Sequence, residues 1–225
     1  MNIDHIPTGI TALDEALNGF GPAELTIIAG RAAIGKSYMM IAMIRNIIQN
    51  NRCPIALFSL EMSVEALVRR KIPQTDLIHI DDTPQLSIAE LRTRCIQLKH
   101  EKSIQAIFID YIQLLNVDNE ADKQRTKSQQ TELIVKFLKA LAEELTLPII
   151  VLSQLGRNID AEQIRPSLDD FREAAETIKN TADKILFIYR PQYYEITDNK
   201  DDSAEIIIAK CADSAVDSVT ISFEY

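Results

Sequence analysis

A glycine-rich segment at residues 30–37 reads GRAAIGKS, and its residue types are suited to binding phosphate. Its two glycines let the backbone curl, so that N–H groups and the start of a following helix surround the phosphates. Lys36 is long enough to reach the β and γ oxygens of a nucleotide, and the Ser37 hydroxyl can ligate Mg²⁺. An apolar run precedes the segment and a helical pattern follows it, which argues against a chance glycine turn. We therefore expect ATP to be bound by Gly30, Arg31, Ala32, Ala33, Ile34, Gly35, Lys36 and Ser37.

Asp110 ends an apolar run over residues 104–109. A carboxylate at the end of a buried strand can hold the water shell of Mg²⁺, and this arrangement downstream of a phosphate-binding loop is typical of ATPases. Aspartate also commonly ends strands for structural reasons, so Asp110 alone would be weak evidence. Together with the glycine-rich segment, it predicts a Mg²⁺ site formed with Ser37.

Two more polar residues follow apolar runs, Glu61 after residues 54–60 and Gln154 at the end of residues 148–154. In a parallel sheet, the strand ends that carry them collect on the same edge as the phosphate-binding loop. Glu61 there is either a general base or a carboxylate at the start of a helix, favoured by the helix dipole. Gln154 either senses the γ-phosphate and orients water or is an ordinary polar residue leaving a strand.

The elements that must position these residues follow from the pattern of apolar runs. Six runs have the length of buried strands, at residues 24–30, 54–60, 77–80, 104–110, 148–154 and 184–190. Ser87 and Glu90 form a capping box before a helical stripe that ends at Leu98, and a second stripe runs from Leu133 to Leu141. The alternation predicts an α/β fold with a mostly parallel sheet and helices on both faces. Residues 204–210 and 219–225 predict antiparallel strands at the carboxyl end.

Composition limits the class of protein. Residues 1–225 fit a single domain with one core. Against 24 Lys and Arg residues stand 33 Asp and Glu residues, a formal charge of -9, so any contact with nucleic acid must be local. Three scattered cysteines without a metal-ligand spacing suit a reducing compartment. Because the sequence lacks both a signal-peptide pattern and an apolar run of about 20 residues, we expect a cytoplasmic protein without membrane association.

A series of short segments, in order along nearly the whole chain, resembles the carboxyl-terminal domain of DnaB-type replicative DNA helicases. The segments are residues 6–9, 30–37, 58–63, 80–84, 109–114, 152–155, 168–173 and 188–190. SLEMS at residues 59–63 and DYIQL at residues 110–114 distinguish this family from recombinases of similar fold. The resemblance implies a RecA-like ATPase that couples ATP hydrolysis to translocation on single-stranded DNA in replication. It also implies Glu61 as catalytic base, Asp110 as Mg²⁺ partner and Gln154 as phosphate sensor beside Lys36.

The chain departs from the family pattern at several places. Family members carry a lysine, and two residues later an arginine finger, that reach the nucleotide of a neighbouring subunit in a six-membered ring; here Lys210 is kept and Ala212 replaces the arginine. The segment after Arg70 is shortened, and the sequence starts without the family's amino-terminal domain and linker. We therefore expect either a ring hexamer, an assembly with related helicase subunits, or, as an alternative function, a nucleotide-binding regulator with weak hydrolysis. A recombination mediator is a weaker alternative.

Two loops correspond to those along which the family binds single-stranded DNA, residues 116–130 and 156–176. Acidic residues interleave with the basic ones and weaken the local positive field, so an ordinary solvated surface is the alternative. Ala174 and Ala175 also stand where relatives have a serine and a glycine, which limits close approach of the backbone. The candidate phosphate contacts are Lys123, Arg125, Lys127, Arg157, Arg165 and Arg172.

Overall fold

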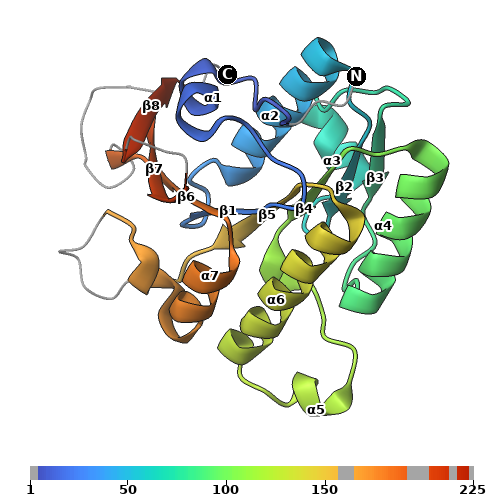
Figure 1. Cartoon of the computed structure of the whole chain (residues 1–225), viewed down its shortest axis with the longest axis vertical. Helices are drawn as coiled ribbons and strands as arrows, with labels where there is room; N and C mark the ends of the chain where they lie inside the picture. The colour runs from blue at the N-terminus through green and yellow to red at the C-terminus, as the bar shows by residue number, and fades with distance from the viewer. Residues whose placement is uncertain (1–4, 157–164, 192–202, 213–216, 223–225) are drawn as a thin grey trace.

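A central sheet carries helices on both of its faces in the computed structural model of the chain (Figure 1). The structure describes residues 5–156, 165–191, 203–212 and 217–222. Within these residues the sheet has eight strands in the order β3-β2-β4-β5-β1-β6-β7-β8. The strand that leads into the phosphate-binding loop, β1, thus lies between β5 and β6, near the middle of the sheet.

The strands of the main body are parallel, and the last two are antiparallel. The parallel set is β1 (Leu25–Gly30), β2 (Ile55–Ser59), β3 (Ile78–Asp81), β4 (Ala106–Asp110), β5 (Ile149–Gln154) and β6 (Lys184–Tyr189). The strand β7 (Ser203–Lys210) runs antiparallel to β6, and β8 (Ser218–Ser222) runs antiparallel to β7. The carboxyl ends of the six parallel strands therefore meet at one edge of the sheet.

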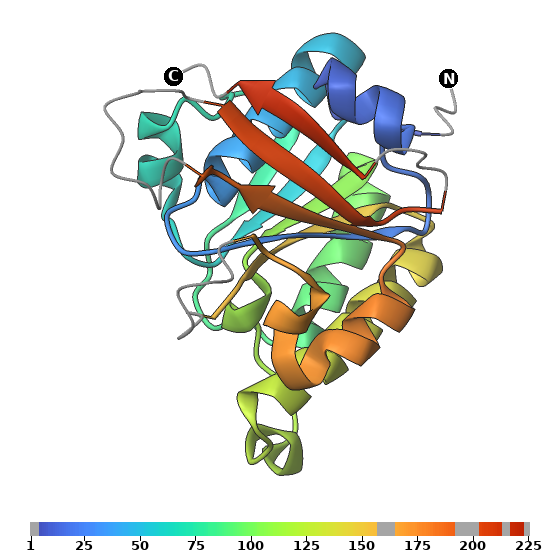
Figure 2. The ribbon, with the colours of Figure 1, turned by 90° about the vertical axis from the view of Figure 1, so that its left-hand side faces the viewer.

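The helices divide between the two faces (Figure 2). On one face lie α1 (Thr11–Leu17), α2 (Lys36–Asn51) and α3 (Val64–Arg69). On the other lie α4 (Ile88–Lys102), α6 (Lys127–Leu145) and α7 (Ala175–Thr181). Short helical turns connect them: η1 (Ile112–Leu114), α5 (Glu120–Lys123) and η2 (Leu168–Ala174). In both ribbon views, α5 projects away from the sheet.

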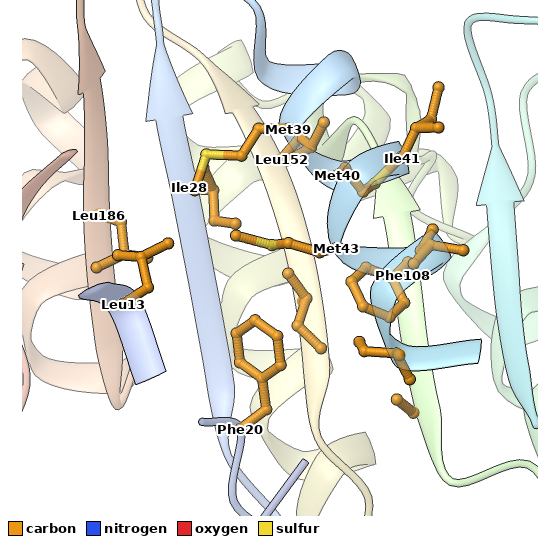
Figure 3. Packing of buried hydrophobic residues seen from close by; sticks show 14 of the residues in the cluster. Leu13, Phe20, Ile28, Met39, Met40, Ile41, Met43, Phe108, Leu152 and Leu186 are labelled. Carbon is orange, nitrogen blue, oxygen red and sulfur yellow. The ribbon is translucent and has the colours of Figure 1, made fainter. Parts of the chain in front are cut away.

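Two hydrophobic cores result, one on each face of the sheet. Because successive side chains of a strand point to opposite faces, Ile28 of β1 packs with the α2 side and its neighbour Ile27 packs with the α6 side. Figure 3 shows Ile28 and Met43 packed together within the core on the α2 side of the sheet. There Phe20 and Phe108 meet edge to face, with ring centroids 6.3 Å apart. This packing fixes α2, and with it the residues at its start.

The predicted elements are confirmed within the described residues, with a difference at one helix. The capping box of Ser87 and Glu90 is formed at the start of α4. The helix predicted from the stripe between Leu133 and Leu141 begins earlier, at Lys127, because Thr126 and Gln129 form another capping box that the apolar pattern did not reveal. Among the helices within the described residues, none combines the length and the apolar character that a membrane span requires.

Candidate nucleotide-binding and catalytic site

The loop between β1 and α2 has the backbone of a phosphate cradle. Gly35 caps the start of α2 with a φ of 111°. In this left-handed conformation, any residue with a Cβ would strain the backbone. A Cβ on Gly30 would lie 2.9 Å from Ile34, so a side chain at this position would clash. Ile34 itself is buried in the core and anchors the loop. The glycines and Ile34 therefore shape the loop, whose N–H groups and helix start are available to phosphate oxygens.

Lys36 extends back across this loop rather than into solvent. The residue is only 8% exposed, and Nζ donates to the carbonyl oxygens of Gly30 at 3.0 Å and Arg31 at 2.8 Å. Burial lowers the pKa of Lys36 from its ordinary value, although the nearby carboxylates of Asp110 and Glu61 act to raise it. The ammonium group is thus held at the loop that would enclose the phosphates.

Asp110 is a buried carboxylate whose oxygens have no well-formed hydrogen bond in the described part of the chain. Burial raises the pKa of Asp110 to about 6. The nearby Ser37 hydroxyl lowers this pKa, although its geometry falls short of a well-formed hydrogen bond. Two buried oxygens without partners, beside a serine hydroxyl, suit a Mg²⁺ ion completed by water and phosphate oxygens. The residues present therefore fit the metal expected from the sequence.

A pocket of about 380 Å³ opens beside these groups. Seven of the residues predicted from the sequence line it, from three different strand-to-helix connections: Ala32, Ala33, Gly35, Lys36, Ser37, Glu61 and Gln154. The other predicted loop residues, Gly30, Arg31 and Ile34, complete the turn without lining the pocket. The fold thus gathers the candidate binding and catalytic groups at the carboxyl edge of the parallel strands.

The surroundings of Glu61 bear on its two possible roles. The N-cap of α3 is Ser63, whose side chain accepts from the N–H of Ala66, and the acidic residue in the first turn is Glu65. Glu61 lies before the cap, in the connection that follows β2, and it is exposed to the pocket. The position that the helix dipole favours is therefore taken by another glutamate, and the geometry favours a role for Glu61 in the pocket.

Four further residues that sequence reasoning did not select also line this pocket: Tyr38, Met62, Arg70 and Tyr111. Tyr38, Met62 and Tyr111 each directly follow a residue selected from the sequence, so their position in the chain could have predicted that they line the pocket. Arg70 had no such signal, because it reaches the pocket from the far end of α3, where it is the C-cap. Its positive charge lowers the pKa of Asp110.

Lys210 and Ala212 lie away from this pocket. Register pairs Lys210 with Ile185 near the start of β6, whereas Glu205 pairs with Tyr189 at its end. Lys210 is therefore at the opposite edge of the sheet from the phosphate-binding loop. Its Nζ donates to the carbonyl oxygens of Lys179, at 2.7 Å, and Ala182. Ala212 follows it and is exposed.

The basic residues proposed for DNA contact differ in their partners. Lys123 pairs with Glu120 at 2.6 Å, and Arg125 pairs with Asp122 at 2.7 Å. Arg165 binds Glu205 through two hydrogen bonds and lies over the ring of Tyr189. Arg157 lies outside the described residues.

Lys127 and Arg172 come together in a second cavity of about 240 Å³. It lies between the start of α6 and the η2 segment, and Gln113, Ser153 and Gln154 also line it. Gln154 therefore borders both this cavity and the candidate nucleotide pocket. Among the basic candidates that the structure describes, Lys127 and Arg172 thus share a concave surface.

Comparisons with known proteins find relatives in one family of helicases. A family described as the DnaB-like helicase C terminal domain matches residues 5–79 and 71–225. The chain is 34% identical to the replicative DNA helicase DnaB of Geobacillus stearothermophilus, over 98% of this chain and 55% of that protein. It is 33% identical to the replicative DNA helicase DnaC of Bacillus subtilis, over 99% of this chain and 55% of that protein. The chain thus spans about half the length of the curated relatives it matches.

Solved structures of similar proteins have the same fold as this chain. One of them, described as an ATPase domain, superposes with a TM-score of 0.84 at 28% identity, covering 99% of this chain and 89% of that domain. A DnaB-like replicative helicase, described with its interactions with primase, superposes with a TM-score of 0.86 at 28% identity. That match covers 100% of this chain and 61% of the other. The fold is RecA-like, with a mostly parallel sheet and antiparallel strands at its carboxyl end, as the sequence predicts.

Proposed function

This chain belongs to the DnaB-like helicase C-terminal domain family, and from that premise we propose that it is the ATP-hydrolysing motor of a replicative DNA helicase. The observation that carries the proposal is the convergence of Lys36, Ser37, Glu61 and Gln154 on one pocket, with the buried Asp110 beside it. An ATPase needs groups of these types: a cation for the phosphates, ligands for a metal and a base for water.

Each residue has a defined task in this mechanism. Lys36 exchanges the carbonyl oxygens of Gly30 and Arg31 for the β and γ oxygens of ATP, and the loop N–H groups bind the remaining phosphate oxygens. Ser37 and Asp110 would hold Mg²⁺, which neutralises charge on the phosphates when it is bound. Glu61 accepts a proton from the attacking water. Gln154, at the end of β5, contacts the γ-phosphate and responds to its loss.

Movement along single-stranded DNA would use the surface beside Gln154. Lys127 and Arg172 line the second cavity, and α5 carries the neighbouring loop outward from the sheet. Phosphate groups of a single strand would bind these cations, so affinity would fall with salt concentration. Because Gln154 borders both cavities, loss of the γ-phosphate can alter the DNA contacts.

We propose that the active assembly is a ring in the cytoplasm, in which each site is completed by a second copy of the chain or by a related subunit. Lys210 supports this, because its place at the opposite sheet edge keeps it from the nucleotide of its own chain. In a head-to-tail arrangement the same edge can face the pocket of the next copy. Lys210 would then release the carbonyls of Lys179 and Ala182 to reach the phosphates.

Two measurements test the proposal together. Steady-state ATP hydrolysis is measured with and without single-stranded DNA, and mass is measured with and without ATP. We expect DNA to raise the turnover number, and ATP to favour a hexameric mass. ATP binding without turnover in an assembled hexamer would contradict the motor function and leave a nucleotide-binding regulator.

A further inference from the structure

The strand β5 extends beyond its neighbour β4 at the edge where the nucleotide pocket opens. Register between them pairs Ile109 with Val151 and goes no further within the described residues. Past this point β4 ends at Asp110, and the chain turns into η1. On its other side β5 stays paired to its last residue, where Gln154 lies opposite Gly30 of β1. The last residues of β5 therefore lose a strand neighbour where Gln154 must be placed.

The side chain of Gln113, in the η1 turn, takes the place of the missing neighbour. Its Oε1 accepts a hydrogen bond from the backbone N–H of Gln154 at 3.2 Å, and its Nε2 donates to the carbonyl oxygen of Gln154 at 3.0 Å. The same Nε2 donates to the hydroxyl of Ser153 at 3.1 Å. One side-chain amide thus satisfies both backbone groups of Gln154 on this side, which in a parallel pair would otherwise bond two alternate residues of a longer β4.

We infer that Gln113 is a positioning residue that holds the end of β5, so that the Gln154 side chain stays at the nucleotide pocket. The two bonds from one planar amide orient the two peptide units that flank Gln154, and the pairing of β5 with β1, including the bond from the N–H of Leu155 to Gly30, holds the strand end from the other side. Gln113 also lines the second cavity, beside Lys127 and Arg172. An occupant of that cavity that displaces Gln113 therefore changes the position of Gln154.

The inference rests on the proposed role of Gln154 in hydrolysis. It adds Gln113 as the residue that links Gln154 to the second cavity. Gln113 is itself exposed, so its hydrogen bonds compete with water and contribute little to overall stability. Its contribution is to the geometry of the two peptide units that flank Gln154. This difference separates the inference from an ordinary structural role, which would lower the melting temperature and leave turnover per folded molecule unchanged.

A double-mutant cycle in the full chain tests the inference. We expect Gln113→Ala to lower the turnover number for ATP by about tenfold, the equivalent of one or two lost hydrogen bonds in the transition state, with little change in KM. Because Gln113 acts through Gln154, the variant with both Gln113→Ala and Gln154→Ala is expected to match Gln154→Ala alone. The inference would be overturned if the double variant lost turnover by the product of the two single losses. A normal turnover in Gln113→Ala would also overturn it.

Two further variants sharpen the cycle. Gln113→Glu keeps an acceptor for the N–H of Gln154 but loses the donor to its carbonyl oxygen, and we expect a turnover as low as that of Gln113→Ala. Gln97→Ala is the matched control, because Gln97 is a glutamine on the surface of α4 that bonds only its neighbour Glu101 among the described contacts. It should leave turnover and melting temperature unchanged.

Amide hydrogen exchange separates failure of the inference from failure of the proposed function. In nucleotide-bound protein, the amide of Gln154 is expected to exchange faster in Gln113→Ala than in the unmodified chain, while that of Val151 is unchanged. If the unmodified chain does not hydrolyse ATP but this difference is present, the proposed function fails and the positioning by Gln113 stands. Equal exchange at Gln154 in both proteins would overturn the inference whatever the turnover.

Discussion

Gly30 and Gln154 lie opposite each other in the pairing of β1 with β5, and the N–H of Leu155, next along the chain, donates to the carbonyl oxygen of Gly30 at 3.0 Å. The phosphate-binding loop and the candidate sensor therefore leave the sheet side by side. Lys210 lies at the other edge. In the proposed ring, the two edges of one sheet would carry the two halves of a site that neighbouring copies share.

Replacement of Lys36 tests the phosphate-binding loop. Lys36→Ala removes a buried ammonium that would make charge-assisted hydrogen bonds with phosphate oxygens, each worth about 1.5–3 kcal/mol. We expect ATP affinity, measured by calorimetry, to fall by roughly 100-fold or more, since each 1.4 kcal/mol is about tenfold.

Lys210→Ala is the matched control for this experiment. Lys210 also donates to two backbone carbonyls, but it lies at the opposite sheet edge. In dilute, unassembled chain its replacement should leave ATP affinity unchanged. Equal losses in the two variants, or unchanged affinity in Lys36→Ala, would remove the assignment of the loop.

Replacement of Glu61 separates binding from hydrolysis. Glu61→Gln keeps the size of the side chain but removes its capacity to accept a proton, and general bases typically contribute about 10²- to 10⁴-fold to a rate. We expect the turnover number to fall by at least about 100-fold while ATP affinity stays near normal. Glu65→Gln, in the first turn of the adjacent α3, should leave turnover unaltered. A fast Glu61→Gln enzyme would assign the base elsewhere.

Much of the fold was predictable because its signals are local. Runs such as residues 104–110 are long enough and apolar enough to be buried strands, and the capping box at Ser87 and Glu90 marks the start of α4. The lining of the pocket by Glu61 and Gln154 followed from a general property of parallel sheets, whose carboxyl ends share an edge. These inferences needed no knowledge of contacts between distant side chains.

The features that escaped prediction depend on such contacts. Arg70 reaches the nucleotide pocket only because α3 is short and ends beside it. Arg165 belongs to a loop expected to bind DNA, yet it bonds Glu205, a residue 40 positions away on β7. Likewise, the hydrogen bonds of Gln113 to Gln154 depend on where β4 ends. No periodicity or spacing in the sequence records these pairings.

The buried charge of Asp110 has a cost in stability. The pKa of Asp110 in the folded chain, about 6, lies above its ordinary value, so the folded state holds this proton more tightly than the unfolded state. At neutral pH the ionised carboxylate therefore destabilises the fold, and this penalty diminishes as pH falls through 6. We expect Asp110→Asn to raise the free energy of unfolding by about 1–2 kcal/mol at pH 8, without nucleotide or Mg²⁺. At pH 5 the gain should be about half as large.

Denaturant unfolding at several pH values measures this effect, and Asp81→Asn supplies a control of opposite sign. Burial acts to raise the pKa of Asp81, but hydrogen bonds from Thr83 and Arg94 outweigh it and lower that pKa. Asp81→Asn should therefore destabilise the fold at neutral pH. An Asp110→Asn protein less stable than the unmodified chain throughout this range would contradict the assignment of an unsatisfied buried charge.

Two lysines on either side of the turn after α5 test the DNA surface. Lys123 pairs with Glu120, whereas Lys127 contacts the neutral Gln130 and lines the second cavity. We expect Lys127→Gln to weaken binding of single-stranded DNA and to reduce the slope of log affinity against log salt by about 0.7, the value for one phosphate contact. Lys123→Gln should have a smaller effect on the slope, because its charge is already neutralised. Equal slopes for Lys127→Gln and the unmodified chain would exclude Lys127 from the DNA surface.

Introduction of an arginine at Ala212 tests whether neighbouring copies complete the site. Ala212 is exposed two residues beyond Lys210, at the sheet edge that would face the next pocket. An arginine finger is worth about 10³- to 10⁵-fold in turnover where it reaches the transferred phosphate, so we expect Ala212→Arg to raise ATP turnover by at least about tenfold. The gain must depend on protein concentration, because the arginine acts on the nucleotide of another copy.

Ala212→Gln, which adds length without charge, should give no gain at any concentration. If the gain in Ala212→Arg were the same in dilute monomers as in assembled protein, the arginine would be acting within its own chain, and the division of the site between two sheet edges would be wrong.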